Sequence, residues 1–219
     1  MFDSIQALIF DLDGLLIDSE LSYRQAWQQA VREMGYELEN VFFERLVGLD
    51  ANAVEQVLLQ SLPEHFDLNT FRQLSAECWH SQVHAFGIPV MPGVHEVLFQ
   101  LQRLGWLSAV ATNSHRSQAL KLLEIAGLGN EFKQIFTRDQ VEKPKPAADI
   151  YLLAAESLCL APQQCLVLED SFTGVQAAIA AGMKCCWIPV TSADSSCSEY
   201  DDCLVLNSLH DVALRLQPL

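Results

Sequence analysis

Basic residues are scarce in this sequence. Its 219 residues include 13 Lys and Arg against 28 Asp and Glu, which gives a formal net charge of −15 at pH 7. Nucleic acids and anionic membrane surfaces attract basic patches, so neither is an expected partner. A small anionic substrate remains compatible, because a bound cation can reverse the field inside one cleft.

Three other patterns are missing. No C-x-x-C spacing occurs among the seven cysteines, whose number is odd, so buried free thiols in a reducing compartment are expected rather than disulfides. Cys78 and His80 have no second ligand pair at zinc-like spacing. No apolar run approaches the ~20 residues of a membrane-spanning helix, and the N-terminus shows no signal-peptide pattern. We therefore expect a cytoplasmic protein.

The most informative stretch begins with four apolar residues, Ala7–Phe10, a pattern that predicts a strand buried on both faces. Asp11, Asp13 and Gly14 follow. Residues two apart in a strand point to the same side, so the two carboxylates start close together at the strand's carboxyl end, where open parallel sheets bind ligands. At ~4 Å and an effective dielectric constant of ~20 they repel by roughly 4 kcal/mol. Such a pair needs a cation, a shared proton or a functional reason, unless it belongs to a solvated turn.

The block from residue 18 to residue 86 has a helical pattern. Apolar residues recur at helical spacing, and no strand pattern occurs from Ser19 to Phe86. Helices are predicted over residues 20–35, 42–47, 51–62 and 68–86. We interpret this block as a helical cap inserted into a core made of residues 1–17 and 87–219.

Strands and helices alternate after residue 91, which predicts an α/β fold with a doubly wound parallel sheet. The predicted strands span residues 106–112, 134–137, 165–168, 185–189 and 203–206. The predicted helices span residues 92–104, 114 or 117–126, 147–158, 172–181 and 209–216. Ser171 is the expected N-cap of the helix over residues 172–181, and an exposed loop rich in Ser and Asp is expected over residues 191–202.

Three further strand ends carry polar side chains. Thr112-Asn113-Ser114 precedes a helix, where hydroxyl and backbone N–H groups suit a phosphate, although Ser114 could instead cap that helix. Lys145 comes before Pro146, which would fix the entry of the next helix and hold the lysine as a positioned cation rather than a solvated one. Glu169 and Asp170 end another strand.

Together these strand ends predict a single site. Four carboxylates placed together without a cation would be strongly destabilising. Oxygen ligands favour Mg²⁺ over a transition metal, and the lysine adds a second positive charge. The parts indicate a magnesium ion, a phosphate pocket and a carboxylate nucleophile.

The same residues resemble the four motifs of the haloacid dehalogenase superfamily, and most closely its beta-phosphoglucomutase-like phosphatase branch, which carries a helical cap after the first motif. The matching segments, in order, are Asp11–Glu20, Ala111–Ser114, Lys145–Tyr151 and Glu169–Met183. They extend over nearly the whole chain. The resemblance implies a Rossmann-like core, Mg²⁺ as the cofactor, and hydrolysis of a small phosphorylated metabolite through an aspartyl-phosphate.

The resemblance also implies a role for each matching residue. Asp11 would be the nucleophile, Asp13 the general acid and then the base, and Lys145 the bridge between nucleophile and phosphate. Phosphate oxygens would be held by Thr112 and by the Asn113 N–H. The metal ligands would be Asp11, Asp170 and the main-chain carbonyl of Asp13, with Glu169 acting directly or through water. An aspartyl-phosphate divides one difficult step into two easier ones.

Two lysines compete for the third motif. Counting back from Asp149-Ile150-Tyr151 gives Lys145, whereas the pattern Lys143-Pro144-Lys145-Pro146 matches the prolines better but moves Asp149 out of register. We favour Lys145, because shifting a helix register costs more than replacing one proline.

The choice between phosphatase and mutase depends on the predicted cap. Mutases of this branch carry a His twelve residues after the nucleophile, where this chain has Tyr23. They also carry an Arg three residues after a Gly of the cap, where Gly48 is followed by Ala51. Both departures favour hydrolysis, with a beta-phosphoglucomutase-type mutase as the alternative.

The remaining expectations concern the substrate and assembly. Asp13 indicates phosphoryl transfer rather than dehalogenation, and a closing cap suits a small substrate such as a sugar phosphate. Ser114, His115 and Arg116 are candidate substrate contacts, although a polar first helical turn explains His115 and Arg116 equally well. A non-enzymatic phospho-acceptor or scaffold is a remote alternative, because receiver domains share the acidic cluster but lack a cap. We expect a monomer or weak homodimer.

Overall fold

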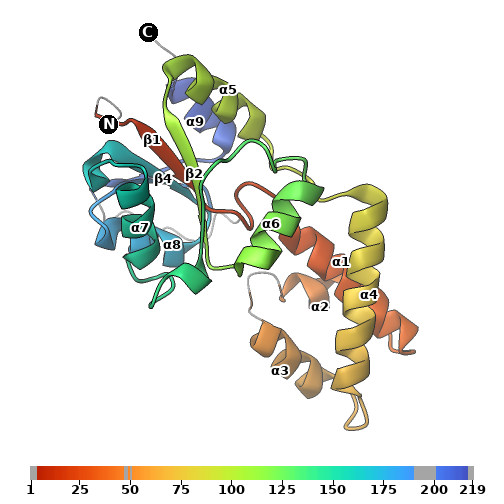
Figure 1. Cartoon of the computed structure of the whole chain (residues 1–219). Coiled ribbons are helices and arrows are strands. Elements are labelled where there is room, and N and C mark those ends of the chain that lie inside the picture. Colours follow the sequence, from red (N-terminus) through yellow and green to blue (C-terminus); the bar gives the residue numbers. More distant parts are fainter. Residues whose placement is uncertain (1–3, 47–48, 50, 190–200, 217–219) are drawn as a thin grey trace. The chain divides into compact units, whose positions relative to one another are not determined.

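The computed structural model describes residues 4–46, 49, 51–189 and 201–216. The chain divides into two compact units (Figure 1). One consists of Met1–Ile17 with Pro89–Leu219, and the other of Asp18–Ile88. Gly87 and Ile88 therefore go with the helical unit.

The larger unit is built on a six-stranded sheet. Its strands are β1 (Ala7–Phe10), β2 (Leu107–Thr112), β3 (Ile135–Thr137), β4 (Cys165–Glu169), β5 (Lys184–Trp187) and β6 (Cys203–Val205). The strand order is β3-β2-β1-β4-β5-β6, and every neighbouring pair is parallel. The chain builds outward from β1 first in one direction and then in the other, so β1 lies at the switch point of the sheet. This topology confirms the predicted doubly wound parallel sheet.

Both faces of the sheet are covered, which explains the apolar run in β1. Ala7 and Ile9 belong to a core cluster with α7 (Asp149–Ser157) and α8 (Phe172–Ala180). Leu8 and Phe10 are fully buried as well, and alternate residues of a strand point to opposite faces. The helices α5 (Val94–Leu104) and α9 (Leu209–Arg215) lie on that opposite face (Figure 1). The remaining elements of this unit are α6 (Arg116–Ile125) and two short 3₁₀ helices, η1 (Arg138–Gln140) and η2 (Pro162–Gln164).

Several helix starts differ by one or two residues from the sequence-based expectation, among them those of α6 and α7. Helix α7 begins at Asp149 rather than at residue 147, because the Ala147 N–H closes a separate turn onto the Pro144 carbonyl at 3.0 Å. Helix α6 begins at Arg116, so neither Ser114 nor Ser117 caps it. The predicted cap of α8 is confirmed, since the Ser171 side chain accepts a hydrogen bond from the backbone N–H of Gly174.

The helical unit contains α1 (Ser19–Glu33), α2 (Asn40–Glu44), α3 (Ala51–Ser61) and α4 (Leu68–Phe86), and no strand within its described residues. The Asp18 carboxylate caps α1 by accepting the Leu21 N–H. The unit has a core of its own, which includes Phe43, Leu58 and Phe71. Helix α2 starts two residues earlier than predicted and ends at Glu44, before the predicted end at residue 47, which lies outside the described residues.

No helix in the described part of the chain is long and apolar enough to cross a membrane.

The described cysteines are free thiols. Cys78, Cys165, Cys185 and Cys186 are buried as predicted, whereas Cys159 is exposed. Burial raises the pKa of the Cys165 thiol to about 11, so this thiol stays protonated and unreactive. Cys197 and residues 191–200 of the predicted Ser- and Asp-rich loop lie outside the described residues.

Candidate active site

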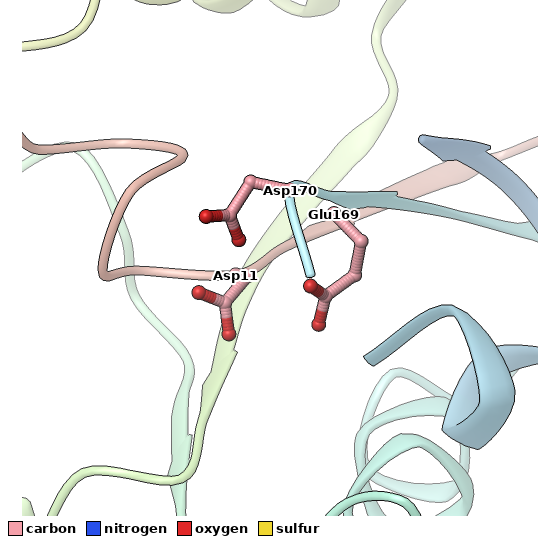
Figure 2. A group of neighbouring side chains, drawn as sticks. All are labelled: Asp11, Glu169 and Asp170. Carbon is pink, nitrogen blue, oxygen red and sulfur yellow. The ribbon is translucent and has the colours of Figure 1, made fainter. Parts of the chain in front are cut away.

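Three carboxylates meet at the carboxyl ends of β1 and β4 (Figure 2). Asp11 directly follows β1, and its N–H donates to the Leu168 carbonyl of β4 at 3.0 Å. Glu169 is the last residue of β4 and Asp170 follows it, and as successive residues they point to different sides (Figure 2). Each of the three offers an oxygen within 4.8 Å of the others. A set of carboxylate oxygens at such spacing suits a hard divalent cation.

Lys145 lies within this acidic group. Its side chain is buried, and its ammonium donates to Asp11 Oδ1 at 2.5 Å, to Glu169 Oε1 at 2.6 Å and to the Ala111 carbonyl at 2.8 Å. These bonds use all three donors of the ammonium group. Lys143, the competing residue, is exposed, and its backbone N–H donates to the Asp149 carboxylate. The geometry therefore favours Lys145 for the motif role.

The site carries more negative charge than Lys145 can balance. Burial raises the pKa of Asp11 to about 7, Lys145 opposes the rise, and Glu169 adds to it. Burial alone would lower the pKa of Lys145, but attraction to Asp11 and Glu169 outweighs burial and raises that pKa. Lys145 thus remains charged while a second cation is still needed for Asp11 to ionise fully. The donor set and this charge imbalance both fit a bound divalent metal.

Glu169 has both of its carboxylate oxygens hydrogen-bonded within the protein. Oε1 accepts from Lys145 and from the Tyr151 hydroxyl at 2.7 Å, and Oε2 accepts from the Ser171 N–H at 3.3 Å and the Ser171 hydroxyl at 3.0 Å. A carboxylate offers about four lone-pair positions, so these donors fill them. A side chain at Gly174 would overlap the Glu169 carboxylate, so glycine is required in α8 at this point. This arrangement disfavours a direct bond from Glu169 to a metal.

The loop after β1 brings Asp13 and Gly14 to the site. Gly14 has φ +85°, and its N–H donates to the Ile17 carbonyl at 2.9 Å. A side chain there would overlap the Asp170 carboxylate, so this glycine serves a close approach as well as a turn. Asp13 Oδ2 accepts a hydrogen bond from the Ser114 hydroxyl at 2.8 Å. Ser114, predicted as a substrate contact, therefore holds Asp13 in this structure.

The end of β2 carries Thr112 and Asn113, the residues predicted to contact phosphate. Thr112 is 1% exposed, and its hydroxyl oxygen accepts the Ser114 N–H at 3.0 Å. Asn113 brackets the backbone of Lys145: its side-chain NH₂ donates to the Lys145 carbonyl at 3.2 Å, and its side-chain oxygen accepts the Lys145 N–H at 3.0 Å. The sequence predicts a role only for the backbone N–H of Asn113, and this side-chain role is visible only in the structure.

Asn113→Ala is expected to lower kcat roughly 10- to 100-fold, because two hydrogen bonds that fix Lys145, each worth about 0.5–1.5 kcal/mol, are lost. Steady-state hydrolysis of p-nitrophenyl phosphate measures the effect. Asn69→Ala, the same change at an exposed position in α4, is the matched control and should leave kcat unchanged. If kcat of Asn113→Ala stays within twofold of that of the unmodified protein, Asn113 does not position Lys145 for the reaction.

His115 and Arg116 lie against Asp139. His115 Nδ1 is 3.6 Å from Asp139 Oδ1, and the His115 side chain is 66% exposed. The Arg116 N–H donates to the same carboxylate, and its guanidinium donates to the Ile135 carbonyl. These contacts join the start of α6 to β3 and η1. A substrate contact by either side chain stays a prediction.

Tyr151 lies in the third motif, and the sequence alone assigns it no role. It is fully buried, and its hydroxyl meets Glu169. The signal that could have found it is general: a buried tyrosine hydroxyl needs a hydrogen-bond partner. A tyrosine in the first helical turn after Lys145 therefore pointed to a polar group within the core.

The fold and site together define a class of protein. A parallel α/β sheet presents carboxylates, a buried lysine and hydroxyl groups at the carboxyl ends of its strands, around its switch point, where such sheets bind ligands. This is the arrangement of an α/β protein with a metal-compatible acidic centre at the switch point of its sheet. The sequence matches the haloacid dehalogenase-like hydrolase family over residues 8–188, and the chain belongs to that family.

Relatives with named activities indicate which reaction a member with this sequence catalyses. The phosphorylated carbohydrates phosphatase of Thermotoga maritima is 31% identical over 82% of this chain and 83% of its own length. The fructose-1-phosphate phosphatase YqaB of Escherichia coli is 31% identical over 84% of this chain and 96% of its own. The crystal structure of a provisionally named beta-phosphoglucomutase from Thermotoga maritima superimposes with a TM-score of 0.85 at 27% identity, covering 97% of this chain and 98% of that one. Family and relatives identify the chain as a phosphatase and confirm the resemblance seen in its motifs.

Proposed function

We propose that this chain is a Mg²⁺-dependent phosphatase that hydrolyses a small sugar phosphate through an aspartyl-phosphate intermediate. The observation that carries the proposal is the buried Lys145, whose ammonium joins Asp11 and Glu169 beside Asp170. A lysine held there can stabilise negative charge on a nearby phosphoryl group while it orients the attacking carboxylate. Phosphoryl transfer depends mostly on such positioning and charge neutralisation.

The metal ligands in this proposal are the side chains of Asp11 and Asp170 and the main-chain carbonyl of Asp13. Bound there, Mg²⁺ would neutralise charge on the phosphoryl group and keep Asp11 ionised. Glu169 would contribute its charge rather than a direct bond to the metal, because the protein already fills its lone-pair positions. Thr112 and the Asn113 N–H would hold the phosphoryl oxygens.

The reaction then proceeds in two steps. A carboxylate oxygen of Asp11 attacks phosphorus, the bond to the substrate oxygen breaks, and Asp13 gives that leaving oxygen a proton. Asp13 next takes a proton from the water that attacks the aspartyl-phosphate, which releases inorganic phosphate and restores Asp11. The hydrogen bond from Ser114 would hold Asp13 in place for both transfers.

A sugar phosphate is the favoured substrate because two relatives of high coverage are named for phosphorylated sugars. The mutase is the second candidate, favoured by the structural likeness to the provisionally named beta-phosphoglucomutase. Tyr23 stands where mutases place a histidine, and its ring stacks on Trp79 with centroids 5.4 Å apart. The second departure from the mutase pattern, the absence of an Arg three residues after Gly48, involves a glycine that lies outside the described residues. Hydrolysis stays the preferred activity.

A phosphate-release screen tests the proposal. The protein is assayed with and without Mg²⁺ on p-nitrophenyl phosphate and on a panel of sugar, nucleotide and small-acid phosphates. We expect metal-dependent release, highest with a sugar phosphate. Conversion of a glucose 1-phosphate to its isomer without release would establish the mutase, and no turnover on any compound would return the phospho-acceptor or scaffold role to consideration.

Asp13→Asn is expected to slow turnover about 10²- to 10⁴-fold while leaving Mg²⁺ affinity largely intact. The reason is that Asp13 offers the metal only its main-chain carbonyl, and its side chain only moves protons. Isothermal titration with Mg²⁺ and steady-state kinetics measure the two properties separately. A large loss of Mg²⁺ affinity in this variant would contradict the division of roles.

We place the protein in the cytoplasm, with a monomer or weak homodimer as its assembly and the helical unit as a cap that closes over the substrate. The free thiols of the described cysteines support a reducing compartment. Size-exclusion chromatography with light scattering tests the assembly.

A further inference from the structure

Tyr151 contacts both members of the ion pair formed by Lys145 and Glu169. Its hydroxyl donates to Glu169 Oε1 at 2.7 Å, and Lys145 Nζ lies 4.9 Å from the centroid of its ring. A cation at that distance from an aromatic ring is attracted to it. The side chain is fully buried in the first turn of α7, close to Lys145 in the chain.

The oxygen that Tyr151 binds is the one that Lys145 also binds. Glu169 Oε1 accepts both the tyrosine hydroxyl and the Lys145 ammonium, whereas Oε2 is held by Ser171. With one lone pair of Oε1 taken by Tyr151, a single position on that oxygen is left for the ammonium. The carboxylate is thereby fixed at both oxygens, so Glu169 attracts the Lys145 ammonium from one fixed position.

We propose that Tyr151 is a positioning residue for phosphoryl transfer: its hydroxyl fixes the Glu169 carboxylate so that the Lys145 ammonium is held at Asp11. The proposal rests on the function proposed above for Lys145. Without the hydroxyl, Glu169 can rotate and draw the ammonium toward itself, which lengthens the 2.5 Å contact between Lys145 and Asp11. A misplacement of this kind costs rate rather than substrate affinity.

Tyr151→Phe separates this role from core packing, because the ring and its contact with Lys145 remain while the hydroxyl is lost. With saturating Mg²⁺ and p-nitrophenyl phosphate, kcat is expected to fall about 5- to 50-fold and KM to change less than twofold. Inhibition by orthovanadate, which mimics the transition state, should weaken by the same factor as kcat, whereas inhibition by inorganic phosphate should not. Tyr36→Phe, in the helical unit, is the matched control and should leave all of these constants unchanged.

A double-mutant cycle shows whether Tyr151 acts through Glu169. In a Glu169→Gln background, adding Tyr151→Phe should change kcat less than twofold, because the group that Tyr151 orients has already been altered. An equal loss in both backgrounds, or a Tyr151→Phe variant with a lowered melting temperature but a kcat within twofold of the unmodified protein, would overturn the proposal. An unmodified protein without turnover would instead overturn the proposed function, and this inference with it.

Discussion

Lys145→Ala is expected to reduce kcat at least about 10³-fold. The substitution removes the buried cation that contacts Asp11, and stabilising charge on a transferring phosphoryl group is among the largest contributions to such catalysis. It also leaves Asp11 and Glu169 buried without their partner, which destabilises the fold. Kinetics with p-nitrophenyl phosphate should therefore be measured where circular dichroism shows the variant folded.

Lys143→Ala is the matched control. Lys143 lies two residues away in the same segment but is exposed, so its replacement should change kcat by no more than a few-fold. Lys145→Arg is a second test that keeps the charge. The wider guanidinium does not fit a buried site with three acceptors arranged for an ammonium, so its turnover should also be low. Strong loss in Lys143→Ala with little change in Lys145→Ala would assign the motif to the other lysine.

Asp11→Asn is expected to reduce turnover at least about 10⁴-fold, because the variant lacks the nucleophile of the proposed mechanism. The same change should stabilise the metal-free protein near neutral pH. Burial raises the pKa of Asp11 from 3.8 to about 7, so the folded state binds a proton there more tightly than the unfolded chain does. Stability from this group is present at low pH and is lost progressively as pH rises from about 4 to 7.

The difference in unfolding free energy between Asp11→Asn and the unmodified protein isolates this effect. It should be small at pH 4 and grow to about 4 kcal/mol, as an upper magnitude, at pH 8. Urea denaturation at several pH values in EDTA measures it, and Mg²⁺ at pH 8 should stabilise the unmodified protein more than the variant. A pH-independent difference would show that Asp11 ionises normally in the folded protein.

Much of the fold followed from local patterns in the sequence. The apolar run of β1 required cover on both faces, and α7, α8, α5 and α9 supply it. Alternating strands and helices required a parallel sheet, whose strand ends share one edge. For that reason Asp11 and Asp170 could be placed together from residues about 160 positions apart, and their proximity in the structure follows the same rule.

Side-chain hydrogen bonds could not be predicted in the same way. The Asn113 side chain hydrogen-bonds the backbone of Lys145 because two loops approach each other. The spacing of residues within either loop does not predict that approach. Ser114 was expected at a helix cap or on substrate, yet its hydroxyl reaches Asp13 across the site. The start of α7 differed from prediction because a turn onto Pro144 competes with the helix for the Ala147 N–H. In the first two cases a contact between distant segments decided between options that were locally equivalent, and in the third a local turn did so.

The central position of β1 also affects how the protein folds. Ala7 pairs with Leu107 on one side and with Cys165 on the other, so the strand that carries Asp11 has partners about 100 and 158 residues later in the chain. Contacts so distant in sequence form slowly, because a long loop must close before they are gained. The helical unit, whose core involves only neighbouring helices, can form during that delay. An apolar strand left unpaired for so long is prone to aggregation, so newly made chains should depend on chaperones or low temperature for yield until β4 has joined β1.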